Sequence, residues 1–218
     1  DEFSVKYIDE RILQTPAIAL AQLIKEMSYM LEVAQRALDK AMDNFINRTE
    51  DEEPVRKDLR EINFLSGKVT DYLIRLSEED MSHNDELTVS SLYKVLSDIM
   101  RVADFSNNIM RYLRVAVANE LYFSSEGLNE IKEMYSLVDE LFKDVDYTFA
   151  NRTTRLLAKI EDTESKTDKF KLQLQQNHLD RLKGGNCKSE SSSLYVNLIG
   201  NIERVADHLV YIAQSVKE

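Results

Sequence analysis

The sequence has few of the residues that break helices or cross-link small folds. Its 218 residues include five glycines, two prolines, one cysteine and no tryptophan. So few glycines and prolines leave little material for the turns of a sheet, which favours long helices. The single cysteine, Cys187, excludes an internal disulfide and fits a reducing compartment. No run approaches the roughly 18 apolar residues of a membrane span, so this stretch is not expected to cross a bilayer.

Basic residues are fewer than acidic ones. The chain has 28 lysines and arginines against 39 aspartates and glutamates, for a formal net charge of −11. This balance argues against a nucleic-acid or anionic-membrane surface, since both need basic patches. It fits a solvated surface or a protein that binds cations. The hydrophobic content of 43% and charged content of 31% indicate a soluble globular protein.

Apolar residues recur at spacings of three and four, which predicts an all-α protein without strands. Thr15-Pro16 is a typical helix start, and Gly184-Gly185 is a typical helix stop. The six helices are expected over 16–47, 54–77, 84–121, 124–145, 151–183 and 189–212. We predict two tandem three-helix bundles of long antiparallel helices, 15–122 and 123–218, after a leading segment, 1–14.

An internal repeat relates the two halves. Asp98-Ile99-Met100-Arg101-Val102-Ala103-Asp104-Phe105 is matched about half the chain later by Asn201-Ile202-Glu203-Arg204-Val205-Ala206-Asp207-His208. Such a repeat indicates one helical unit used twice. The copies differ at one informative position, because Met100 stands where the second copy has Glu203. Only the second copy therefore has a Glu and an Asp four residues apart, on one helix face.

A second Glu–Asp pair of this spacing, Glu164 and Asp168, lies on the preceding predicted helix. Antiparallel packing of these two helices would allow the pairs to face each other. Four converging carboxylates repel, and raised pKa values or a hard cation relieve the repulsion. Spacing by itself does not establish a metal site, because such a pair is more often a solvated helix face. We interpret Asp39 with Asp43, and Glu140 with Asp144, in that ordinary way.

The segment from Glu203 to His208 resembles the Glu-Arg-Ile-Gly-Asp-His signature of the PhoU family of phosphate-transport regulators. The resemblance implies two three-helix bundles, with metal clusters held by paired acidic motifs on two helices of a bundle. Carried over by position, it assigns a metal ion or cluster to Glu164, Asp168, Glu203 and Asp207. The metal would be iron, zinc, manganese or magnesium, with phosphate contact through it.

The first half departs from that pattern. Leu59, Asn63 and Met100 align with ligand positions and leave Asp104 as the one carboxylate. We therefore predict that the first cluster is absent. His208 points about 100° around its helix from Asp207, which favours a surface or interface role over ligation. The resemblance to the family signature keeps ligation by His208 open as the alternative.

The segment from Tyr7 to Arg11, with Thr15 to Leu20 after it, is similar to a junction in bacterial sodium/phosphate cotransporters of the NptA kind. There it joins the membrane part to a C-terminal PhoU-like domain. The resemblance implies a regulatory, non-catalytic tail at the cytoplasmic face of the membrane, with the transporter's membrane domain as partner. A first residue other than Met agrees with an excised tail.

Other interpretations stay open at this stage. They are a free-standing phosphate-uptake regulator, a metal-free helical interaction module and, least favoured, a metallohydrolase or oxidase, which would lack a positioned base or nucleophile. The oligomeric state is open too, a homodimer included.

Overall fold

The computed structural model describes residues 2–185 and 187–217, which fold into long helices without any strand. A short 3-10 helix, η1 (Glu10–Ile12), precedes α1 (Pro16–Asn47), α2 (Glu53–Ser77) and α3 (His83–Ala118). The second half contains α4 (Ser125–Asn151), α5 (Leu157–Lys183), α6 (Ser189–Gln214) and a terminal turn, η2 (Ser215–Lys217). The all-α prediction is confirmed. No helix of the described residues is long and apolar enough to cross a membrane.

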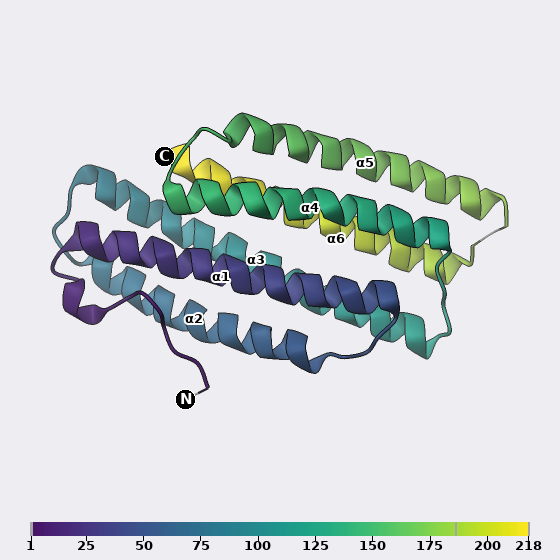
Figure 1. Ribbon diagram of the computed structural model, residues 1–218, viewed down its shortest axis with the longest axis horizontal. Coiled ribbons are helices and arrows are strands. Elements are labelled where there is room, and N and C mark those ends of the chain that lie inside the picture. The colour runs from purple at the N-terminus through teal and green to yellow at the C-terminus, as the bar shows by residue number, and fades with distance from the viewer. Residues whose placement is uncertain (1, 186, 218) are drawn as a thin grey trace.

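The halves are joined through α1, α3, α4 and α6, while α2 and α5 lie at opposite outer edges (Figure 1). Helices α1 to α3 pack on one another, as do α4 to α6, and α3–α6 and α1–α4 contacts connect the two sets. One continuous apolar core runs through both. Small side chains on α1, including Ala34, Ala37 and Ala41, are fully buried and let neighbouring helices approach closely.

Three helix boundaries differ from the sequence expectation by several residues, because α4 runs to Asn151 and not to Val145, α5 starts later and α3 ends earlier. Left-handed residues lie at two of the helix ends, those of α4 and α3. The helix expected from Asn151 to Lys183 starts at Leu157, because α4 runs through Asn151 and ends where Arg152 adopts φ 53°. The helix expected to reach Leu121 ends at Ala118, and Glu120 has φ 52°. Neither site has the glycine that usually signals such an end, so the sequence did not predict the stops.

The leading segment is held against the first bundle. The buried carboxylate of Glu26 on α1 accepts hydrogen bonds from the backbone N–H groups of Lys6, Tyr7 and Ile8. The Tyr72 hydroxyl donates to the carbonyl of Asp9 at 2.8 Å. These contacts attach residues 6–9 to α1 and α2.

Candidate metal centre

The acidic residues of α5 flank its buried face. Ile160, Thr163 and Thr167 point into the core, and their helical spacing places Glu164 and Asp168 at the edge of that face. The Thr163 and Thr167 hydroxyls donate to carbonyls of their own helix, at 3.0 and 2.9 Å. Both hydroxyl hydrogens are therefore engaged by backbone carbonyls of α5. The polar groups left at the edge of the buried face are the carboxylates of Glu164 and Asp168.

Helix α6 presents its acidic pair in the same way. Ile202, Val205 and Ala206 are buried, with 1% exposure each, whereas Glu203 and Asp207 lie half-buried beside them. The connection after Lys183 is short, so α6 returns antiparallel along α5 (Figure 1). This hairpin places the acidic pair of α5, Glu164 and Asp168, along the same α5–α6 contact (the seam) as Glu203 and Asp207 of α6.

The structure brings three of the four sequence-assigned residues together. Asp168, Glu203 and Asp207 each place one ligand oxygen so that all three lie within 4.8 Å of one another. Glu164 lies beside this group, because its charge contributes to the raised pKa of Asp207. Asp168 is exposed and the other three are half-buried, so the cluster is open to solvent on one side.

The crowding raises the pKa values of three carboxyl groups. Burial and the neighbouring charges of Glu203, Glu164 and Asp168 raise the pKa of Asp207 to about 7. Burial, then the charge of Asp168, raises the pKa of Glu164. Burial, then the charge of Glu203, raises the pKa of Asp168. Near neutral pH, the raised pKa of Asp207 therefore favours a protonated carboxyl group at this position of the metal-free cluster.

The cluster fits a hard metal ion. Its donors are all carboxylate oxygens, the ligands that magnesium, manganese and calcium prefer. Oxygen atoms bound to one ion at 2.0–2.6 Å lie roughly 3–4.5 Å apart, and the three oxygens, all within 4.8 Å of one another, are close enough for small side-chain movements to reach that spacing. A bound cation would compete with the proton on Asp207 and offset part of the negative charge of the four carboxylates.

The corresponding positions of the first half are not gathered in this way. Leu59 is buried, Met100 packs partly buried against the core, and Asn63 and Asp104 are exposed. Among residues 2–185 and 187–217, one group of three or more potential ligands lies within 4.8 Å, and it is the α5–α6 group. The absence of a metal from the first half stays a prediction.

His208 occupies the interface expected for it. Its Nδ1 lies 2.9 Å from Asp98 Oδ1 on α3, and its ring packs 6.0 Å from Phe105. Beside it, Asn108 of α3 donates to the Asn201 side chain of α6 at 2.9 Å. Asp98 and Asn108 could not be identified as partners from the sequence, because their roles depend on how α3 packs on α6.

A second acidic group lies at the α1–α4 contact, where the sequence analysis expected a solvated face. Tyr135 on α4 donates to Asp39 on α1 at 2.6 Å. Burial, then the charge and hydrogen bond of Asp39, raises the pKa of Asp139 to about 6. Asp43 adds repulsion to both aspartates. Spacing along one helix could not reveal this group, because Asp139 comes from the other half.

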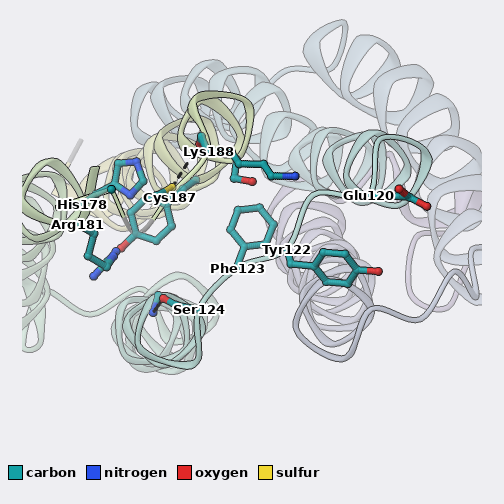
Figure 2. Close-up of a pocket in the computed structure, with 12 residues that line it drawn as sticks. Glu120, Tyr122, Phe123, Ser124, His178, Arg181, Cys187 and Lys188 are labelled. Carbon is teal, nitrogen blue, oxygen red and sulfur yellow. Dashed lines mark hydrogen bonds between the residues drawn. The ribbon is translucent and has the colours of Figure 1, made fainter. Parts of the chain in front are cut away.

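A cavity of about 360 Å³ lies at the far end of the α5–α6 hairpin, under the loop between α3 and α4 (Figure 2). Its wall includes Phe123, Tyr195 and His178, with Arg181 beside them. The Arg181 guanidinium lies 2.7 Å from the buried Glu130 carboxylate. Its charge is therefore already balanced, which makes this cavity a weaker functional candidate than the carboxylate cluster.

Comparison with known proteins shows the family to which the chain is related. The PhoU domain model matches residues 27–113 and 131–216, one segment in each half. YjbB of Salmonella typhimurium, described as a candidate inorganic phosphate export protein, is 22% identical over 222 residues. YjbB of Escherichia coli K12 is 24% identical over 225 residues. Each match covers 98% of this chain but 40% of the relative, so the chain spans less than half the length of these proteins.

A shorter relative matches along most of its length. The phosphate-specific transport system accessory protein PhoU homolog 1 of Thermotoga maritima is 24% identical over 205 residues. That match covers 90% of this chain and 85% of the relative. Because the family model covers both halves of the six-helix fold, the chain belongs to the PhoU domain family.

Proposed function

We propose that this chain is a non-catalytic regulatory domain of a phosphate transporter whose second bundle carries one carboxylate metal site. The observation that carries the proposal is the convergence of Asp168, Glu203 and Asp207, with the charge of Glu164 acting on Asp207. Glu164, Asp168, Glu203 and Asp207 would hold the cation, iron, zinc, manganese and magnesium being the candidates. When bound, the cation would supply positive charge that joins α5 to α6 and offers a contact for phosphate.

We propose that regulation depends on how α6 packs against α5 and α3. Its Asp207 side faces α5, and the adjacent His208 contacts Asp98 of α3. A cation that draws α5 and α6 together therefore acts on the helix that also joins the two halves. We propose that the loaded and unloaded states differ in this packing, and that a transporter's membrane domain responds to the difference.

Within this proposal, the domain is a cytoplasmic tail of a sodium-dependent phosphate cotransporter. Two observations support a tail: the resemblance of the segment from Tyr7 to Arg11 to a cotransporter junction, and the matches that cover 40% of the YjbB proteins. The attachment of residues 6–9 to Glu26 and Tyr72 would hold any preceding domain in a set orientation.

A free-standing phosphate-uptake regulator is the second candidate. The match that covers 85% of the Thermotoga maritima accessory protein favours it. The reading frame upstream of Asp1 separates the two candidates, because a tail requires membrane spans encoded there.

Elemental analysis of the purified protein tests the metal site. We expect a bound transition metal, or saturable uptake of Mn²⁺ or Mg²⁺, in the wild type and its loss in Glu203→Ala/Asp207→Ala. Asp39→Asn/Asp43→Asn is the matched control, since it removes another acid pair of the same spacing, and it should bind like the wild type. Absence of binding from wild type and control alike would favour a metal-free interaction module.

A further inference from the structure

One lysine reaches into the carboxylate cluster. Lys171 lies one turn after Asp168 on α5, and its Nζ is 3.4 Å from Glu203 Oε2. The side chains of Lys171 and Glu203 are 28% and 18% exposed. The charge of Lys171 also lowers the pKa of Asp168, against the effect of burial. The ammonium thus acts on two of the four carboxylates.

Other nearby cations are engaged elsewhere. Lys166 pairs with Asp162 at 3.3 Å, and Lys217 pairs with Glu161 at 3.5 Å. The Arg204 guanidinium lies over the Phe105 ring, 5.8 Å from its centre. Among the described residues, the contact of Lys171 with Glu203 is the one ion pair that involves any of the four carboxylates.

We propose that Lys171 is a built-in counter-ion that occupies part of the cation position in the metal-free protein and withdraws when a divalent cation binds. The inference rests on the proposed metal site and adds a residue that sets its affinity. Lysine suits this role because its ammonium is a compact charge on a flexible stem, with one face of the cluster open to solvent.

The exchange favours divalent cations by charge. A monovalent ion brings no more charge than the ammonium it would displace, whereas a divalent ion brings twice as much. An ammonium left in place would repel the bound metal across a few ångströms. Lys171 would therefore lower the affinity of the site for every cation. In the metal-free protein, its charge would offset the repulsion among the four carboxylates of α5 and α6.

Mn²⁺ titration of chelator-treated protein tests the inference. Lys171→Met keeps the length of the stem but removes its charge, and we expect it to bind Mn²⁺ about tenfold more tightly than the wild type. Lys171→Arg keeps the charge and should bind no more tightly than the wild type. Lys166→Met removes a charge from the same helix away from the cluster, and its affinity should be unchanged.

Melting of the metal-free proteins gives a second readout. Lys171→Met should melt at a lower temperature than Lys166→Met without metal and match it with saturating Mn²⁺. Mn²⁺ binding by Lys171→Met that equals or falls below that of the wild type would overturn the role of Lys171 and leave the metal site standing. Failure of both the wild type and Lys171→Met to bind Mn²⁺ would overturn the metal site, and this inference with it.

Discussion

His208 follows Asp207 in the chain, yet its imidazole Nδ1 lies 2.9 Å from Asp98 Oδ1 on another helix. Asp98 is 7% exposed, and its second oxygen has no hydrogen-bond partner. One turn of α6 therefore contributes an acid to the carboxylate cluster on one side and a histidine to the contact between the two halves on the other. This adjacency is the physical link between the proposed site and the rest of the molecule.

Replacing His208 should affect stability and spare metal affinity. His208→Ala leaves Asp98 buried without its partner, which should cost about 1–3 kcal/mol of unfolding free energy. Urea denaturation measures the loss, with the exposed His83→Ala as control. Mn²⁺ affinity should stay at the wild-type value. A drop as large as that of Asp207→Ala would instead identify His208 as a ligand.

The metal-free protein should lose stability as pH rises toward neutrality. The folded-state pKa of Asp207, about 7, exceeds its ordinary value of 3.8, so its protonated form favours folding. That contribution is complete below about pH 4 and is lost as pH rises through about 7. A full shift would correspond to about 4 kcal/mol, and solvent screening of this half-buried group lowers the expected effect to about 1–2 kcal/mol.

Asp207→Asn checks this dependence. The variant cannot ionise at that position, so its melting temperature should fall less between pH 4 and 7.5 than that of the wild type. The charges that face Asp207 are Glu164, Asp168 and Glu203, and Lys171 pairs with Glu203 among them. All four remain in the variant. Equal pH profiles would contradict the assignment of the proton to Asp207.

The acidic group at the α1–α4 contact should also lower the stability of the protein as pH rises, but over a lower pH range. The folded-state pKa of Asp139 is raised to about 6 by burial and by Asp39. Its contribution to stability is lost as pH rises from about 4 through about 6. Asp139→Asn should therefore be more stable than the wild type at pH 7.5, by about 0.5–1 kcal/mol after screening. Asp162→Asn, an exposed aspartate on α5, is the control for a general loss of negative charge.

Glu26 should hold the leading segment in place. It is fully buried and accepts backbone hydrogen bonds at 2.9 Å from Lys6 and 2.8 Å from Tyr7. Glu26→Ala leaves these donors without an acceptor, at a cost of about 2–3 kcal/mol. Hydrogen exchange of residues 6–8 should accelerate in this variant and stay slow in Glu32→Ala, an exposed position on the same helix. Slow exchange in both would show that other contacts, such as Tyr72 with Asp9, suffice.

Helix starts could be predicted from the sequence where residues close together in the chain determine the backbone conformation. Pro16 and Ser124 mark helix starts that the structure reproduces within a residue, because capping and proline geometry act over one turn. Prediction from the sequence failed at Arg152 and Glu120, where non-glycine residues adopt a left-handed conformation that no short-range signal announces.

The sequence by itself determined the helical fold and its division into similar halves, and it placed each Glu–Asp pair on one face of its helix. Tertiary structure alone decided which acidic side chains meet. Asp39 with Asp43 and Glu203 with Asp207 have the same spacing, yet the first pair meets Asp139 of α4 and the second meets Asp168 of α5. Spacing determines the face of one helix, whereas the electrostatics of a carboxylate depend on which other helix lies against that face.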